Sequence, residues 1–303
     1  MIEFHEGVMA LKTGFVGAGK VGFTLGKYLT THGARVTGYY SRNTDAADDA
    51  AQFTHSQSYR ELGDLVADSD VLFLTVPDSS IAAMAAAICE YPIQGKIICH
   101  CSGALSAEAA MPGAEQFGAS VYSVHPLFAV SDRYAAYREL SDVFFALEGS
   151  ADRLDAVNTW LKGLGLSVQI IDRSSKARYH CAASMASNLV VGLVAQSIAM
   201  LETCGFSRER AQQALMPLVL GNVAHMAEDG IIDALTGPVE RGDTKTVAAH
   251  LDCFDKANDR LLYALLSQKL LALAKTKHPD RSYQSLENLL LSLGETTQNE
   301  KHG

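Results

Sequence analysis

Three glycines near the beginning of the chain have the spacing of a phosphate-binding turn. They are Gly17, Gly19 and Gly22, in the segment TGFVGAGKVG. In such a turn the first glycine permits a tight bend, the second leaves room for a pyrophosphate, and the third lets the next helix pack closely. The first turn of that helix offers free N–H groups to the phosphates. The residues predicted to bind a dinucleotide here are Gly17, Ala18, Gly19, Lys20, Val21 and Gly22.

The elements around this turn support that interpretation, because the glycine spacing alone is weak evidence. An apolar strand precedes it, a helix is expected over residues 20–31, and a strand over residues 35–40 completes a βαβ unit. The alternative is a glycine-rich turn in some other α/β protein. The three contexts together favour the dinucleotide site.

The end of the second strand indicates which dinucleotide. A site for NAD usually has Asp or Glu there, which binds the ribose hydroxyls. This chain reads Tyr-Tyr-Ser-Arg-Asn over residues 39–43, and its next carboxylate is Asp45. Ser41, Arg42 and Asn43 can donate hydrogen bonds to a 2′-phosphate, whose charge the guanidinium would also pair. The sequence therefore predicts NADP, with a solvated loop arginine as the alternative reading of Arg42.

A second set of polar residues lies on an otherwise apolar segment. Four of them follow one another at intervals of four: Lys176, His180, Ser184 and Asn188. Residues at this spacing share one face of a helix, and a polar stripe usually borders a wet cavity. The alternative is a set of hydrogen bonds between helices in the core. Histidine titrates near neutral pH, so His180 is the first candidate for a general acid. Lys176 is the second candidate, Asn188 completes the predicted catalytic set, and Ser184 is expected to contact the substrate.

A polar turn later in the chain contains an arginine, whose guanidinium is always positively charged. Residues 235–243 read LTGPVERGD, with two glycines and a proline that constrain the backbone. Arg241 is predicted to hold a substrate carboxylate. Asp243 is predicted to lie at the same site and to cap the helix that begins at Thr244, and a purely structural cap is the alternative.

The continuous apolar run over residues 71–76 predicts a strand that is covered on both faces. Further strands are expected at 96–101, 120–124, 143–147 and 168–171. Ligands bind beyond the carboxyl ends of such parallel strands. The residues expected along this rim, beside the nicotinamide, are Val76, Pro77, Asp78, Ser102, Gly103, His125 and Pro126. Val76, Pro77 and Ser102 are predicted to bind the cofactor, and His125 the substrate.

Strands alternate with helices up to about residue 172, and long helical segments follow. The expected fold is α/β, a doubly wound Rossmann sheet followed by an all-α C-terminal domain. The predicted domains are residues 9–172, which bind the dinucleotide, and residues 173–303, which serve the substrate and dimerisation. Within the first domain, Ser58 and Glu61 have capping-box spacing and predict the start of a helix. The long helices are expected at 174–203, 208–227, 244–252, 256–275 and 282–293.

Composition narrows the class of protein. A net charge of −9 over 303 residues argues against nucleic acid as a partner. Six cysteines without paired spacing favour a reducing cytoplasm over a disulfide framework. Cys99, His100 and Cys101 lie in a strand pattern without a partner pair elsewhere, so no metal site is predicted.

Two segments are relevant to whether the chain crosses a membrane or carries a signal peptide. Residues 181–201 carry no charge and are long enough to span a bilayer. They contain Ser, Asn and Gln, so a buried helix is expected and no membrane partner is predicted. The first twelve residues lack a long apolar core, so they do not predict a signal peptide, and Met9 is a candidate native start.

Five segments stand out together: FVGAGKVG, the SGA after the fifth strand, HPLF, YHCAASMASN and ALTGPVERGD. They resemble the Rossmann-like reductases that carry the domain of unknown function DUF2520. The resemblance covers nearly the whole chain, and the last two segments are specific to that group. Its wider relatives are the 6-phosphogluconate-dehydrogenase-like enzymes, which include ketopantoate reductase, pyrroline-5-carboxylate reductase, prephenate dehydrogenase and the β-hydroxyacid dehydrogenases.

The resemblance implies hydride transfer from NADPH and a homodimer through the long helices. Some members look like an alternative class of ketopantoate reductase. Many relatives have a catalytic lysine on the first long helix with asparagine one turn later, whereas His180 is at about that place here and Lys176 one turn earlier. Either residue therefore stays a candidate for the acid.

The expected function is NADPH-dependent reduction of a small 2-oxo acid, with ketopantoate as the best single guess. One alternative is a cyclic-imine reductase of the pyrroline-5-carboxylate type. The other is a non-catalytic NADP-binding regulatory protein.

Overall fold

The computed structural model describes the backbone of residues 11–299 and the side chains of residues 11–291. The candidate start at Met9 lies outside the described residues. The chain forms two compact units, one that ends at Val190 and one that begins at Val191.

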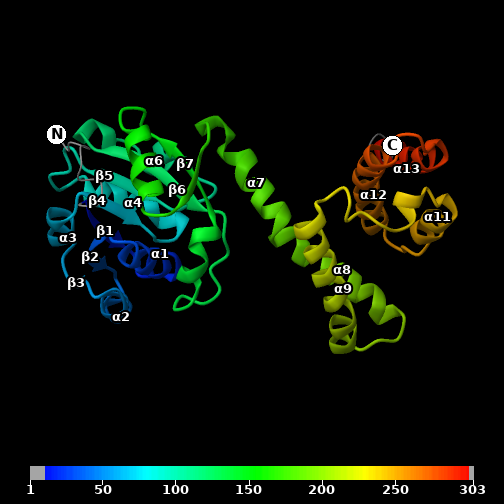
Figure 1. The fold of residues 1–303 in the computed structure, drawn as a ribbon, viewed down its shortest axis with the longest axis horizontal. Coiled ribbons are helices and arrows are strands. Elements are labelled where there is room, and N and C mark those ends of the chain that lie inside the picture. The colour runs from blue at the N-terminus through cyan, green and yellow to red at the C-terminus, as the bar shows by residue number, and fades with distance from the viewer. Residues whose placement is uncertain (1–10, 300–303) are drawn as a thin grey trace. The chain divides into compact units, whose positions relative to one another are not determined.

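The first unit is built on an eight-stranded sheet (Figure 1) with the order β3-β2-β1-β4-β5-β6-β7-β8. Neighbouring strands run parallel except β6 and β7, which are antiparallel. The predicted mostly parallel, doubly wound sheet is confirmed. The strands are β1 (Lys12–Val16), β2 (Arg35–Tyr40), β3 (Gln57–Tyr59), β4 (Val71–Leu74), β5 (Ile97–His100), β6 (Ser120–Pro126), β7 (Phe144–Gly149) and β8 (Ser167–Ile170).

Helices return the chain so that β1 to β6 end at one edge of the sheet. They are α1 (Lys20–Thr31), α2 (Thr44–Thr54), α3 (Leu62–Asp68), α4 (Asp78–Ile88), α5 (Ala107–Ala110) and α6 (Leu154–Gly163). The predicted capping box is wrong, because Ser58 lies in β3 and α3 begins only at Leu62. Pairing with β2 supplies main-chain hydrogen bonds to this segment, and that outweighs the local capping signal.

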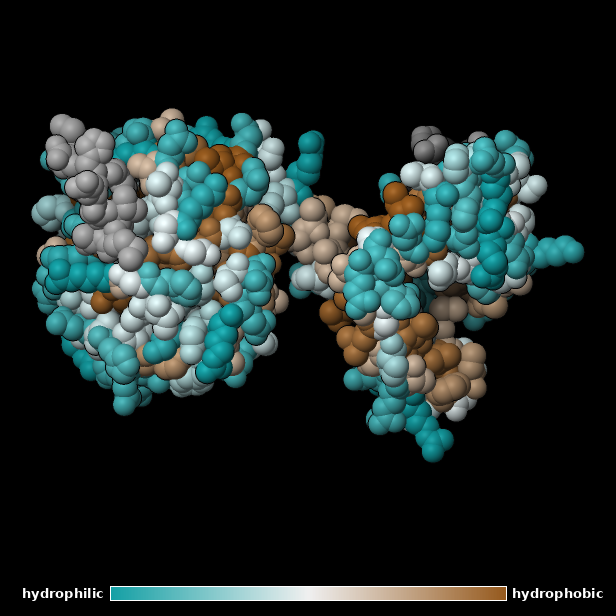
Figure 2. Space-filling view, in the orientation of Figure 1, coloured by the Kyte–Doolittle hydropathy of each residue, from teal (hydrophilic) through white to brown (hydrophobic). Residues whose placement is uncertain are grey.

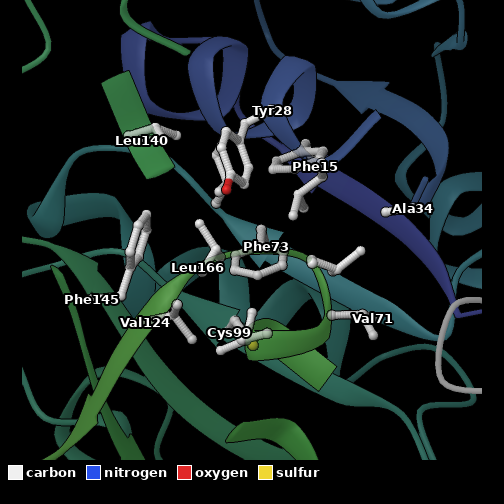
Figure 3. Close-up of a cluster of buried hydrophobic side chains, with 14 of the residues drawn as sticks. Phe15, Tyr28, Ala34, Val71, Phe73, Cys99, Val124, Leu140, Phe145 and Leu166 are labelled. Atoms are coloured by element: carbon white, nitrogen blue, oxygen red, sulfur yellow. The ribbon is translucent and has the colours of Figure 1, made fainter. Parts of the chain in front are cut away.

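Aromatic and branched side chains fill the space between the sheet and its helices (Figure 3). Phe15 of β1 stacks on Phe73 of β4, with 5.5 Å between ring centroids, and on Tyr39 of β2 at 5.1 Å. All four residues of β4 are buried. The strand ends are therefore held by a close-packed layer and can position side chains rigidly.

The predicted helix over residues 174–203 is interrupted. α7 (Lys176–Ala186) ends at Ser187, whose φ of −124° and ψ of −78° leave the helical region, and α8 (Asn188–Thr203) follows. The polar stripe is thus split, since Asn188 begins the second helix. α7 lies in the first unit, because Lys176 and Tyr179 bond to side chains of β6. The compact units therefore divide after Val190, whereas the sequence-based boundary lies at 172/173.

The second unit is helical, as predicted. Its helices after α8 are α9 (Arg208–Asp229), α10 (Pro238–Arg241), α11 (Thr244–Asp252), α12 (Ala257–Lys277) and α13 (Gln284–Asn299). α11, α12 and α13 share a core that includes Val247, Leu271 and Leu290.

The helices α8 and α9 expose much of their apolar surface, which appears brown in Figure 2. Val191 is 71% exposed and Leu218 is 64% exposed. The expectation of a buried helix is wrong for the single chain, because only 6% of the most apolar stretch within residues 173–203 is buried. Within the described part of the chain, this is the one helical segment long and apolar enough to cross a membrane.

Candidate active site

The glycine turn joins β1 to α1 and is open on one side. Gly17 has a φ of +108°, and a Cβ there would lie 2.8 Å from the carbonyl oxygen of Thr75, so only glycine fits. A Cβ on Gly22 would lie 2.5 Å from the carbonyl oxygen of Gly17, which shows how closely α1 packs on the turn. At Gly19 the nearest atom is 3.8 Å away. The turn therefore has free space beside the helix N-terminus, as a pyrophosphate requires.

A groove of about 150 Å³ runs beside this turn. Residues at the ends of β1, β2 and β4 line this groove, and none of the lining residues has a carboxylate. Asn43 uses its side-chain oxygen to accept from the N–H of Ala46 at 3.1 Å, and so caps α2 beside the exposed Arg42. The lining residues are Val16, Gly17, Ala18, Gly19, Tyr40, Ser41, Arg42, Thr75, Val76, Pro77 and Met84.

Ser102 connects this groove to the next strand ends. Its hydroxyl donates to Asp78 Oδ2 at 2.7 Å, and Asp78 directly follows Pro77 in the groove. Its N–H donates to Nδ1 of His100 at 3.0 Å. Ser102 is 5% exposed. The loop after β5 is therefore fixed against the start of α4, next to the predicted nicotinamide position.

Two histidines meet over the following residue, Gly103. A Cβ on Gly103 would lie 2.5 Å from Nδ1 of His180 and 2.7 Å from Nε2 of His125. The two imidazole rings are nearly perpendicular, at 87°, with centroids 6.2 Å apart. A side chain larger than hydrogen at position 103 would displace at least one ring.

These histidines line a pocket of about 640 Å³, here called the histidine pocket. Its wall is mostly apolar, and the polar groups are few. Polar groups converging in an apolar pocket are typical of small-molecule sites. The pocket is lined by His125, Pro126, Leu127, Phe128, Ala129, Tyr179, His180, Ala182, Ala183, Ser184, Ala186, Ser187 and Asn188.

Lys176 does not line this pocket. It is 3% exposed, and its ammonium donates to the hydroxyl of Ser123, which donates to the carbonyl oxygen of Ser102 at 3.3 Å. Glu148, 1% exposed, accepts from the N–H of Ala107 at 2.8 Å. Burial lowers the pKa of the Lys176 amine, and the charge of Glu148 opposes that shift. Lys176 thus lies beneath the strand ends as a buried cation.

His125 is held from behind by Tyr179, whose hydroxyl lies 2.8 Å from Nδ1. Burial lowers the pKa of His125 to about 4, helped by the positive charge of Lys176 and by His180, while Asp78 acts in the opposite direction. Burial raises the pKa of Tyr179 to about 12. At pH 7 the pair is therefore a neutral imidazole and a neutral phenol.

Comparison with known proteins agrees with this geometry. Residues 7–126 match a Rossmann-like domain, and residues 143–270 match the domain of unknown function DUF2520. The chain combines a Rossmann-like domain with a DUF2520 domain. No curated protein matches its sequence.

Solved structures with the same fold include reductases. A protein of Thermotoga maritima is 25% identical with a TM-score of 0.72, over 88% of this chain and 99% of the other. A protein of Bacteroides fragilis, provisionally named an NADP oxidoreductase, is 20% identical with a TM-score of 0.64, over 88% and 99%. A reductive aminase of Aspergillus terreus, solved with NADPH and ethyl-5-oxohexanoate, is 14% identical with a TM-score of 0.59, over 96% and 94%. This Rossmann-like and DUF2520 architecture is also structural kin of imine reductases and of a pyrroline-5-carboxylate reductase.

The structure brings most of the predicted site residues of this Rossmann-like/DUF2520 chain into two places. Lys20 and Val21 begin α1 beside the groove. Ser184 and Asn188 share the histidine pocket with His125 and His180. Arg241 is exposed in the second unit, where Asp243 caps α11 by accepting from the N–H of Thr246 at 3.0 Å. The predicted substrate contacts of these last two residues stay predictions.

Three residues of this neighbourhood, Tyr179, Ser123 and Glu148, were missed by the sequence analysis. Gly103 and Asp78 were expected on the rim beside the nicotinamide, and here Asp78 bonds Ser102 while Gly103 adjoins both histidines. Tyr179 directly precedes His180 in the segment YHCAASMASN, yet nothing in the neighbouring sequence indicates that it bonds His125. Ser123 and Glu148 lie inside strands, where a polar residue is the only hint.

The cysteine and histidine residues of β5 are buried. Among the described residues no group of three or more His, Cys, Asp or Glu side chains could hold a metal ion. His100 Nδ1 already accepts from Ser102, and all six cysteines are free.

Proposed function

We propose that this chain is an NADPH-dependent reductase of a small carbonyl compound, with a 2-oxo acid such as ketopantoate as the leading substrate. One observation carries the proposal. The dinucleotide groove and the histidine pocket adjoin through consecutive residues, because Asp78 of the groove side bonds Ser102 and the next residue, Gly103, contacts both histidines. A carbonyl carbon in the pocket would then lie beside the nicotinamide.

Each part of the site has its own role in the proposed reaction. NADPH, when bound, supplies the hydride. The N–H groups at the start of α1 take the pyrophosphate, and Arg42 takes the 2′-phosphate. The mostly apolar wall lowers the local polarity, which strengthens hydrogen bonds to the charge that develops on the substrate oxygen. His125, His180 and Tyr179 carry exchangeable protons at the pocket, with Ser184 and Asn188 as orienting groups.

The kinship with known reductases supports a cofactor of this type, since the reductive aminase was solved with NADPH and an oxo ester. It also favours a second candidate. Imine reductases and a pyrroline-5-carboxylate reductase share the fold, so a cyclic imine is the alternative substrate.

A substrate panel tests the proposal. The full-length protein is mixed with NADPH and, in separate assays, ketopantoate, other 2-oxo acids and pyrroline-5-carboxylate, and loss of NADPH absorbance is followed. Oxidation with an oxo acid supports the proposal. Oxidation with the imine alone supports the alternative, and tight NADPH binding without turnover on any compound would favour a non-catalytic NADP-binding protein. We place this activity in the cytoplasm.

We predict that NADPH binds more tightly than NADH and that Arg42→Ala removes most of the difference. Loss of a charge-assisted contact to the 2′-phosphate should weaken NADPH binding by about 1.5–3 kcal/mol. Titration of both cofactors by fluorescence measures the preference. Arg35→Ala is the matched control, because Arg35 is an exposed arginine at the opposite end of β2. Equal affinity for both cofactors in the unmodified protein would contradict the assignment.

We also propose that a second copy of the chain covers the exposed faces of α8 and α9. Apolar surface of this extent is unfavourable in water. Ser184, Ser187, Asn188, Gln196 and Ser197 interrupt the apolar run, which suits a protein partner better than lipid.

The expected mass in solution is twice the 32.5 kDa of one chain. Sedimentation equilibrium measures it. Val191→Glu and Leu218→Glu each bury a charge in the proposed interface and should shift the protein toward a monomer. A monomeric unmodified protein, or one that stays in solution only with detergent, would exclude the dimer.

A further inference from the structure

The hydrogen bond between Tyr179 and His125 bears on which nitrogen of the imidazole carries the proton. The phenol of Tyr179 keeps its proton at neutral pH, and its one near partner is Nδ1 of His125, at 2.8 Å. If the phenol donates, Nδ1 accepts and the proton of the neutral ring lies on Nε2. If Nδ1 carried the proton, it would donate to the phenol oxygen, and the phenol hydrogen would then need a second acceptor, which no described residue supplies. The first arrangement satisfies both groups.

Nε2 of His125 lies close to Gly103, where an added Cβ would be 2.7 Å from it, and the ring lines the histidine pocket. No hydrogen bond from Nε2 to another described residue is formed, and Gly103 leaves the space beside it free of a side chain. An N–H donor without a protein partner in this pocket is available to an acceptor on a ligand.

His180 is placed differently, although its ring lines the same pocket. Its Nδ1 is fully buried against Gly103 and has no hydrogen-bond partner among the described residues. No side chain in the described part of the chain therefore fixes its tautomer in the way that Tyr179 fixes that of His125.

We infer that His125, with Tyr179 behind it, donates to the reacting atom of the substrate, and that this atom is a carbonyl oxygen rather than a protonated imine nitrogen. A carbonyl oxygen has lone pairs that accept from Nε2–H. A protonated imine carries its own N–H and no lone pair, so it would meet the imidazole donor with a second donor. This inference rests on the proposed reductase function and names its substrate class.

The proton step balances. As the carbonyl carbon gains hydride from NADPH, the π pair moves to oxygen and gives an alkoxide. The alkoxide takes the proton from Nε2 of His125, and Nδ1 takes the phenol proton of Tyr179. The phenolate of Tyr179 is then reprotonated by solvent. Tyr179 is a positioning residue and proton reserve, whereas His125 touches the reacting oxygen.

The tautomer can be measured without turnover. In protein labelled with ¹⁵N-histidine, two-bond ¹H–¹⁵N correlation at pH 7 should show His125 as a neutral ring protonated on Nε2, with Nδ1 in the range of a hydrogen-bond acceptor. Tyr179→Phe should convert this signal to a mixture of tautomers. A ring protonated on Nδ1, or one that Tyr179→Phe leaves unchanged, overturns the inference.

The second unit supplies a matched control. His250 Nδ1 lies 2.8 Å from the hydroxyl of Tyr263, with rings at 82°, which is the geometry of His125 and Tyr179, at 2.8 Å and 86°. His250 is exposed and lies outside the pocket. Tyr263→Phe should therefore leave both the His125 signal and turnover unchanged.

Kinetics test the donor and the substrate class. With ketopantoate, His125→Gln should lower kcat roughly 100-fold or more, Tyr179→Phe roughly 10-fold with little change in KM, and His180→Gln less than His125→Gln. A larger loss of kcat in His180→Gln than in His125→Gln overturns the donor assignment.

The substrate class has its own test. Faster turnover of pyrroline-5-carboxylate than of every oxo acid, unaffected by His125→Gln, overturns the substrate class. If no compound is reduced, the proposed function fails, and the tautomer measurement still decides the role of Tyr179.

Discussion

Gly103→Ala is expected to lower turnover by roughly 100-fold while the protein stays folded and binds NADPH. The added methyl would lie 2.5 Å from His180 and 2.7 Å from His125, closer than real contacts allow. Both neighbours are side-chain rings and not backbone, so the rings move and the fold survives. A displacement of about 1 Å at a reacting group is enough for an effect of this size.

The matched control for this variant is Gly163→Ala. Gly163 lies at the end of α6, and a Cβ there meets nothing within 4 Å. Turnover is measured with the best substrate of the panel, and the imidazole signals of both histidines report whether the rings have moved. Wild-type turnover in Gly103→Ala would show that the two rings need not approach each other over this residue.

Lys176→Met is expected to destabilise the first unit by about 3 kcal/mol. The substitution removes the buried cation that bonds Ser123 and leaves Glu148, 1% exposed, without the positive charge of Lys176, which favours the ionised carboxylate. Glu148→Gln can keep the bond from Ala107 and removes the negative charge. Adding it to Lys176→Met should therefore recover part of the loss, which a double-mutant cycle measures.

Urea unfolding followed by tryptophan fluorescence is the measurement for this cycle. Trp160 is the one tryptophan of the chain, is 1% exposed and lies on α6, so its emission reports the first unit alone. Lys162→Met on the same helix is the control, because Lys162 is exposed. Additive effects of the two substitutions would show that Lys176 and Glu148 do not stabilise each other. A Lys176→Met protein that is as stable as the unmodified protein but has lost turnover would instead indicate a catalytic role for Lys176.

Local sequence patterns were enough to predict the dinucleotide-binding part of this protein. The glycine turn, the strand before it and α1 are contiguous in the chain, and a βαβ unit forms from such neighbours. The absence of a carboxylate after β2 was visible in the same way, because the residues that end a strand also line the groove. The helices of the second unit were also predicted closely, since a cap such as Asp243 is a local signal.

The tertiary structure alone decided how the histidine pocket is organised. His125 and Tyr179 are 54 residues apart, and Ser123 and Lys176 are 53 apart, so no spacing rule relates them. The stripe of Lys176, His180, Ser184 and Asn188 looked uniform in sequence, yet the fold buries the first and places the last after a break at Ser187. Helical spacing tells which side chains share a face, whereas burial, partner and proton position depend on what packs against that face. For this chain the packing partner is the end of β6, which determines that Lys176 is a buried cation and that Tyr179 holds His125.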